Sequence, residues 1–165
     1  MGKRVVALAL GLAVVAHVRA FGAEDAFRFI VTGDTRGATN GVNLTILAEQ
    51  RDACIAEGAE LVLVPGDLVS TGQQSQLEFW VQTFMAPLQA AGIQVLPCRG
   101  NHDFINSATA WATVFSGPQA LPDNGPPGEK GWTYSVHYKT ALFVAMDHYA
   151  AAPPLQVNQT WLDAQ

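Results

Sequence analysis

The sequence is poor in cysteine and in charge, and it has no apolar run long enough to cross a membrane. Two cysteines, Cys54 and Cys98, occur in 165 residues, whereas a disulfide scaffold needs more cysteines in a shorter chain. We therefore expect two mostly buried thiols. Basic residues number 9 against 14 acidic ones, giving a formal net charge of −5. This charge disfavours non-specific binding to nucleic acid or anionic lipid.

The first residues have the layout of a signal peptide. Lys3 and Arg4 precede an uncharged apolar run at residues 5–16, and small residues follow it. A membrane helix needs about 20 apolar residues, so removal fits better than anchoring. We expect residues 1–20 to be cleaved off, at a point between residues 20 and 23, which leaves no membrane span. The protein would then be exported, periplasmic or extracellular, and its net charge would change from −5 to −8 because three basic residues leave with the leader. An uncleaved anchor and a buried N-terminal strand are the alternatives.

The apolar pattern predicts two strand–helix units and a third strand. A chain that is 49% apolar and 14% charged can form one globular domain. Runs rich in β-branched and apolar residues predict strands at residues 27–32, 60–64 and 93–96. Helical spacing predicts helices at residues 43–58 and 75–91. Right-handed crossovers make such strands parallel, so the loops that follow them should lie at one edge of the sheet.

The remainder of the chain predicts a change of architecture. Residues 118–128 are rich in proline and glycine and should form a surface loop. Strands at 132–138 and 141–147 should follow, as a hairpin or as neighbours in a second sheet. A helix begins near residue 157, and no cap closes it before the sequence ends. We therefore expect residues 27–165 to be the N-terminal portion of a longer domain, incomplete at its C-terminus.

Three short polar motifs follow the three predicted strands at intervals of roughly 33 residues. They are Gly33-Asp34-Thr35-Arg36, Gly66-Asp67-Leu68-Val69 and Gly100-Asn101-His102-Asp103. Two carboxylates brought together repel each other unless a cation lies between them. An amide oxygen is a suitable neutral ligand for a hard cation. Asp34, Asp67 and Asn101 are therefore candidate metal ligands.

The third motif also contains a candidate catalytic pair, His102 and Asp103. Asp103 could hold one imidazole nitrogen and so fix the tautomer of the ring. A histidine oriented in this way can contact phosphate or protonate a leaving oxygen. A His-Asp pair in isolation is usually structural, and it is the Gly-Asn-His-Asp context at a strand end that indicates a catalytic role.

The order of these motifs resembles the calcineurin-like metallophosphoesterase superfamily. Its members carry Asp-x-His, Gly-Asp-x-x and Gly-Asn-His-(Asp/Glu), followed by a separate His and by Gly-His-x-His. The similarity extends from Phe27 to about Gln165 and includes a Trp-Thr-Tyr-Ser strand and an Ala-Leu-Phe-Val-Ala-Met-Asp strand. The resemblance implies an α/β fold that forms part of a four-layer α/β/β/α sandwich. In that fold, parallel strand–helix units are followed by a β-hairpin or by strands of a second sheet.

Carried over residue by residue, the resemblance implies a dinuclear metal site. Asp34 would bind the first ion, Asp67 would bridge both, and Asn101 would bind the second. His102 would face the substrate phosphate, with Asp103 behind it. The implied cofactors are two divalent or trivalent metal ions, which could be iron, manganese or zinc. The implied reaction is attack by a metal-activated hydroxide on the phosphoryl group of a phosphoester substrate.

The sequence departs from the family pattern at two points. Arg36 occupies the place where many members have a metal-binding histidine, and a guanidinium that stays protonated cannot ligate a cation. It could instead bind the substrate phosphate or make a surface ion pair. No Gly-His-x-His follows, so this chain by itself could be inactive for lack of ligands. We expect His137 to be an ordinary strand histidine, and His148 matches no family motif.

Two other functions fit part of the pattern. A non-catalytic binding protein on the same fold would explain Arg36 and the missing histidines. An ester hydrolase of the Gly-Asp-Ser-Leu type shares the Gly-Asp of the first motif, but it has a nucleophilic serine where this chain has Thr35. A domain that carries the motifs by chance would have to leave acidic pairs without a partner, which is costly. The kind of phosphoester and the oligomeric state stay open.

Overall fold

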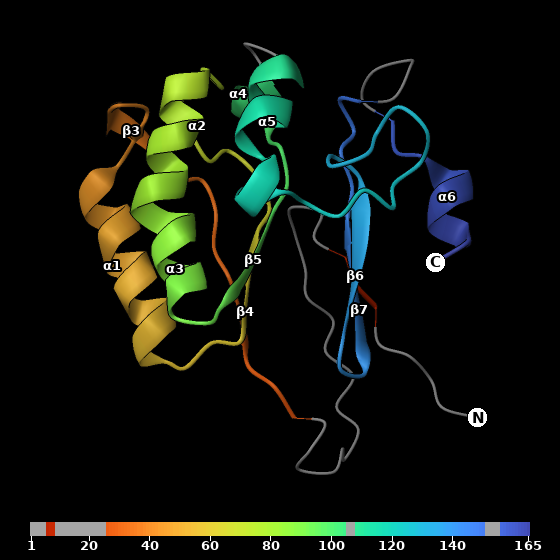
Figure 1. Ribbon diagram of the computed structural model, residues 1–165, viewed down its shortest axis with the longest axis horizontal. Helices are drawn as coiled ribbons and strands as arrows, with labels where there is room; N and C mark the ends of the chain where they lie inside the picture. The colour runs from red at the N-terminus through yellow and green to blue at the C-terminus, as the bar shows by residue number, and fades with distance from the viewer. Residues whose placement is uncertain (1–5, 9–25, 105–107, 151–155) are drawn as a thin grey trace. The chain divides into compact units, whose positions relative to one another are not determined.

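The computed structural model describes residues 6–8, 26–104, 108–150 and 156–165 (Figure 1). The predicted leader lies outside the described residues, except for strand β1 (Val6–Leu8). The chain divides into two compact units. We call residues 28–121 the motif unit, since all three polar motifs belong to it, and residues 1–27 with 122–165 the hairpin unit.

A parallel sheet forms the core of the motif unit. It consists of β2 (Phe29–Val31), β4 (Leu61–Val64) and β5 (Gln94–Pro97), with β4 in the middle. Val62 of β4 pairs with Ile30 on one side and Val95 on the other. Every residue of β4 is buried, as expected for a central parallel strand whose two faces are both covered. The three predicted strands and their parallel arrangement are confirmed.

Two helices lie side by side on one face of this sheet (Figure 1). Helix α1 (Leu44–Ala56) starts at Asn43, whose side chain accepts a hydrogen bond from the Ile46 N–H, as an N-cap residue does. Gly58, with φ of 63°, ends the helix region in the left-handed conformation that favours glycine. The helix predicted at 43–58 is therefore confirmed, over residues 44–56.

The second helix contains a feature that the sequence pattern did not predict. It runs as α2 (Gln74–Trp80), a π-helical turn (Val81–Met85) and α3 (Ala86–Ala90). Pro87 has no N–H to donate to the carbonyl of Thr83, four residues earlier, and its ring crowds that carbonyl. The Thr83 carbonyl instead accepts a hydrogen bond from Arg51 of α1 at 3.2 Å. The helix is thus continuous but locally widened.

The hairpin unit contains the second sheet. Strands β6 (Tyr134–Tyr138) and β7 (Ala141–Ala145) are antiparallel, and β1 pairs with β7 in parallel. The tight connection places Lys139 at φ of 50°. Helix α6 (Gln159–Asp163) follows near the end of the chain. The predicted hairpin is confirmed, and the strands and the last helix are shorter than predicted.

Several short elements were not predicted. They are β3 (Arg36–Thr39), α4 (Asn101–Phe104), α5 (Ala108–Val114) and the 3-10 turn η2 (Gly117–Gln119). Even so, the fold class is confirmed, because a parallel sheet with helices is accompanied by a separate antiparallel pair. None of the helices in the described ranges has the length and apolar character that a membrane crossing requires.

Candidate metal centre

The three polar motifs lie at the carboxyl edge of the parallel sheet. Asp34 comes three residues after the end of β2, and Asp67 comes three residues after the end of β4. Asn101 begins α4, four residues after the end of β5. Because the strands are parallel neighbours, these positions meet at one edge, which is where open α/β sheets bind ligands. Hydrogen bonds from Asp34 N to Gly66 O and from Thr35 N to Asp67 O join the first two loops.

Asp34 and Asp67 share an unusual backbone conformation. Their φ angles are 52° and 55°, in the left-handed region that most residues avoid. Aspartate tolerates this region better than most residues because its short side chain can bond locally. Strained backbone of this kind is concentrated at functional sites. The matching geometry gives the two carboxylates equivalent positions on neighbouring strand ends.

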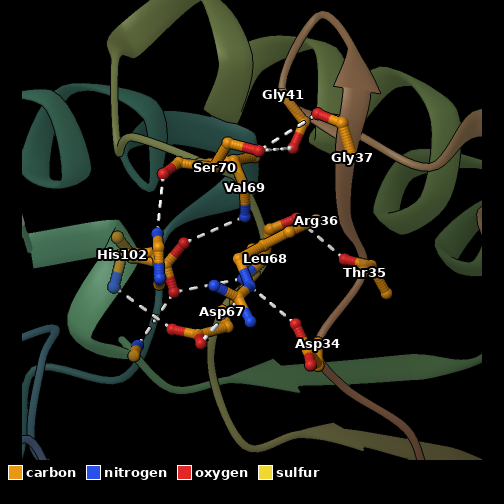
Figure 2. Close-up of polar contacts among 12 residues, drawn as sticks. Asp34, Thr35, Arg36, Gly37, Gly41, Asp67, Leu68, Val69, Ser70 and His102 are labelled. Carbon is orange, nitrogen blue, oxygen red and sulfur yellow. Dashed lines mark hydrogen bonds and ion pairs between the residues drawn. The ribbon is translucent and has the colours of Figure 1, made fainter.

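Arg36 brings the two carboxylates together. Its Nε lies 2.6 Å from Oδ1 of Asp34 and 3.4 Å from Oδ2 of Asp67 (Figure 2). The two oxygens are therefore no farther apart than the sum of these distances. The hydrogen bond from Arg36 lowers the pKa of Asp34 and raises that of Arg36. Asp34 remains largely open to solvent, with 69% of its side chain exposed, against 20% for Asp67.

The turn that contains Asn101 wraps around the Asp67 carboxylate. The His102 N–H donates to Oδ1 of Asp67 at 3.2 Å. On the other side of Asn101, a Cβ added to Gly100 would lie 2.1 Å from the same oxygen, so only glycine leaves room for it. Asn101 is exposed and lies between these two contacts. The structure thus brings Asp34 and Asp67 together and places Asn101 in the turn next to Asp67.

The His102 ring is held by a backbone carbonyl. Its Nδ1 lies 2.8 Å from the carbonyl oxygen of Ser70 (Figure 2). Because a carbonyl oxygen only accepts hydrogen bonds, Nδ1 carries the proton and Nε2 of the neutral ring has the lone pair. Ser70 in turn donates its hydroxyl to the carbonyls of Gly37 and Gly41. Ser70 therefore connects the first loop to His102.

Asp103 has different partners from those predicted. It is fully buried, and its two oxygens accept hydrogen bonds from the backbone N–H groups of Leu68, Val69 and Gly100 at 2.8 to 3.1 Å. Burial raises the pKa of Asp103 to about 6, although the three N–H donors favour its charged form. Asp103 therefore fastens the second loop to the third, and the Ser70 carbonyl performs the orienting role that we predicted for Asp103.

Thr35 positions the first loop. From the sequence, this residue was considered only as the counterpart of the nucleophilic serine in an ester hydrolase. Its side chain is 1% exposed, donates to the Leu68 carbonyl at 2.8 Å and accepts from the Trp80 indole at 3.2 Å. A hydroxyl buried in this way is not accessible to a substrate, which argues against an ester hydrolase with its nucleophile at this position. No sequence signal marks Ser70, because its contacts join loops that are distant in the chain.

The oxygen donors of this cluster suit a hard divalent cation. Within the described ranges, however, no group of three or more His, Cys, Asp or Glu side chains is placed to hold a metal ion. Metal binding here would depend on carboxylate oxygen and the Asn101 amide. His137 is exposed on β6, as expected for an ordinary strand histidine, and His148 stacks on Tyr149; both belong to the hairpin unit.

Comparison with protein families agrees with this geometry. The model of the calcineurin-like phosphoesterase family matches residues 27–150, which is most of the chain. The protein therefore belongs to the calcineurin-like phosphoesterase family, whose members generally bind divalent metals and act on phosphoesters. A search of curated proteins found no match.

Proposed function

We propose that this chain is a metal-dependent phosphoester hydrolase. The observation that carries the proposal is the meeting of Asp34, Asp67 and the Gly100–Asp103 turn at the carboxyl edge of the parallel sheet, in a chain of this family. Asp67 is central, because it contacts both the first loop and the third. Iron, manganese and zinc are all compatible with the carboxylate and amide donors.

Each part of the cluster has a proposed role. Asp67 and Asn101 hold metal, with Asp34 next to them, and the metal when bound supplies a Lewis acid for the phosphoryl oxygens and a more acidic water. His102 acts on the substrate through Nε2, because Nδ1 is engaged with Ser70. In its protonated form, Nε2 can donate to a phosphate oxygen or to the leaving oxygen. Asp103 acts indirectly, by holding the loops on which Asp67 and His102 lie.

Hydrolysis of 4-nitrophenyl phosphate in the presence of Mn²⁺ tests the assignment. Asp67→Asn removes one negative charge from the centre of the cluster and should lower kcat/KM by about 100-fold or more. Asp52→Asn is the matched control, because Asp52 also pairs with a neighbouring arginine but lies on α1. The control should keep wild-type turnover. Wild-type turnover by Asp67→Asn, under the same conditions, would contradict the proposal.

The role of His102 is tested by changing the leaving group. If His102 protonates the leaving oxygen, His102→Gln should slow hydrolysis of an alkyl phosphate by about 100-fold, since alkoxide is a poor leaving group. The same variant should slow 4-nitrophenyl phosphate much less, because nitrophenolate leaves without a proton. Equal losses for both substrates would restrict His102 to phosphate binding.

A second candidate function is a non-catalytic binding protein on the same fold. The observation that favours it is the ion pair between Arg36 and both carboxylates, which satisfies the cluster without metal. Metal content distinguishes the two functions, since a binding protein of this kind would be isolated metal-free and would not take up Mn²⁺. We also propose export of the protein, on the basis of the signal-like pattern at residues 1–20.

A further inference from the structure

Arg36 has a position in the cluster that a metal ion would otherwise take. Its Nε approaches one oxygen of Asp34 and one of Asp67, at 2.6 and 3.4 Å. The side chain is partly sheltered, with 30% of it exposed. An arginine on a flexible surface loop would not by itself be informative, but Arg36 begins β3 and contacts two carboxylates from two different loops. These contacts hold Arg36 in place within the cluster.

The space between these two carboxylates is taken by the guanidinium. An ion that bridges carboxylates must lie about 2.0 to 2.6 Å from each oxygen. The Arg36 N–H points into the region where an ion shared by Asp34 Oδ1 and Asp67 Oδ2 would lie (Figure 2). Arginine does not lose its proton in proteins, so it cannot become a ligand and it repels a cation placed next to it.

Local charge leads to the same conclusion. Two carboxylates and one guanidinium carry a net charge of −1. One divalent ion would bring the net charge of these three side chains and the ion to +1, which suits a phosphoester anion. Two divalent ions would bring it to +3. Resting on the proposed function, we infer that Arg36 replaces the first metal ion of the family's site, and that the chain binds a single divalent cation, at Asp67 and Asn101.

Manganese stoichiometry tests this inference. Isothermal titration calorimetry and electron paramagnetic resonance should give one Mn²⁺ per wild-type chain, with the spectrum of an isolated ion. Arg36→His exchanges the guanidinium for a neutral ligand, and it should bind two Mn²⁺ with an exchange-coupled spectrum. Arg51→His is the matched control, because Arg51 also pairs with an adjacent aspartate, at 2.8 Å, but on α1. The control should still bind one ion.

A second pair of variants keeps the inference testable if Arg36→His does not fold, which circular dichroism would reveal. Asp34→Asn should change Mn²⁺ affinity by less than about fivefold, because Asp34 serves the exposed ion pair. Asp67→Asn should weaken binding by about 100-fold or more. Equal losses in these two variants would overturn the inference.

The outcomes also separate this inference from the proposed function. Two Mn²⁺ ions on the wild-type chain would overturn the role of Arg36 and leave the hydrolase assignment standing. One ion on both the wild type and a folded Arg36→His variant would do the same. No Mn²⁺ on either protein would overturn the proposed function, and the inference with it.

Discussion

At the scale of single residues, the candidate centre is built from aspartates in an uncommon backbone conformation. Asp34 and Asp67 both have positive φ angles, and each follows a glycine at the end of a parallel strand. The conformation is costly for a residue with a Cβ, by about 1 to 2 kcal/mol. The presence of aspartate rather than glycine at both positions is consistent with a functional role for the two carboxylates. Stability measurements can isolate this cost.

We predict that Asp34→Gly is more stable than Asp34→Ala by about 1 kcal/mol, because glycine adopts positive φ without a Cβ clash. Both variants lose the ion pair with Arg36, so that loss cancels in the comparison. Urea unfolding of the metal-free protein measures the difference.

Asp52 provides the control with the opposite expected sign. It is also exposed and paired with a neighbouring arginine, but it lies within α1. There Asp52→Ala should be more stable than Asp52→Gly by about 1 kcal/mol, because alanine is the better helix former. The same order of stability at both positions would contradict the account of the Asp34 backbone.

Asp103 predicts a pH dependence of stability. Its pKa is about 6 in the folded protein, mainly because of burial, compared with an ordinary value of 3.8. The folded state therefore binds the proton more tightly, so this group stabilises the fold most below pH 4, and its contribution decreases as pH rises to about 6. At 1.36 kcal/mol per pKa unit, the total change is about 3 kcal/mol.

The comparison of wild type with Asp103→Asn isolates this effect. In the presence of EDTA, raising the pH from 4.5 to 7 should lower the free energy of unfolding of the wild type relative to the variant. Asparagine does not titrate, and other groups change in both proteins alike. A difference that stays constant would show that the three N–H donors balance burial, and one that changes in favour of the wild type would show that they outweigh it; either result would contradict the prediction.

Much of the placement of the candidate site residues could be predicted from the sequence. The proximity of Asp34, Asp67 and Asn101 could be predicted because each follows an apolar strand, and parallel strand ends meet at one edge. The partners of Asp103 could not be predicted, since the choice between the adjacent imidazole and distant backbone N–H groups depends on how the loops pack. The same holds for Arg36, for which a phosphate contact and an ion pair were both compatible with the sequence.

At the scale of elements, the close approach of the second and third loops depends on glycine. A Cβ on Gly66, which has φ of 118°, would lie 2.8 Å from the backbone of Gly100. A Cβ on Gly100 would lie 2.1 Å from Oδ1 and 2.4 Å from the backbone nitrogen of Asp67. These contacts are with backbone as well as side-chain atoms, so the loops would have to separate to admit a larger residue.

We predict that Gly100→Ala weakens Mn²⁺ binding by about 10-fold or more and lowers stability by about 2 kcal/mol, because it displaces Asp67. Gly92→Ala is the control: its Cβ would meet nothing within 4 Å, and its φ of 81° carries only the backbone cost. That variant should lose about 1 kcal/mol of stability and keep full metal affinity. Unchanged Mn²⁺ affinity in Gly100→Ala would show that Asp67 is not held by this approach.

Element prediction succeeded where apolar periodicity was strong and failed where it was absent. The strands around Val31, Val64 and Pro97 followed from apolar runs. Strand β3 has the sequence Arg-Gly-Ala-Thr, which carries no such pattern and is positioned by bridges to Val42. The π turn arises because Pro87 lacks an N–H and its ring crowds the preceding turn of the helix. The spacing of apolar residues carries no information about this steric effect.

At the scale of the whole molecule, the family match crosses both compact units, since residues 27–150 include all of the motif unit and the hairpin. The candidate centre nevertheless belongs to the motif unit alone. The centre should therefore be intact only while residues 28–121 are folded. The two cysteines lie in this unit and provide a probe of it.

We predict that both thiols are protected from a thiol reagent in the native protein. Cys54 is 2% exposed and Cys98 is 7% exposed, and burial raises the pKa of the Cys54 thiol, which disfavours the reactive thiolate. Labelling with Ellman's reagent should be at least about 100-fold slower than in urea-unfolded protein, because it requires opening of the unit. The single variants Cys54→Ala and Cys98→Ala identify each thiol, and rapid native labelling of either would contradict the packing described.

Anomalous diffraction at the manganese absorption edge would locate the bound cation. In crystals of the protein grown with Mn²⁺, we predict an anomalous peak at the carboxyl edge of the parallel sheet, about 2.0 to 2.6 Å from an oxygen of Asp67 and from the amide oxygen of Asn101. A protein that shows no peak there at saturating Mn²⁺, or a peak coordinated by other residues, would contradict this prediction.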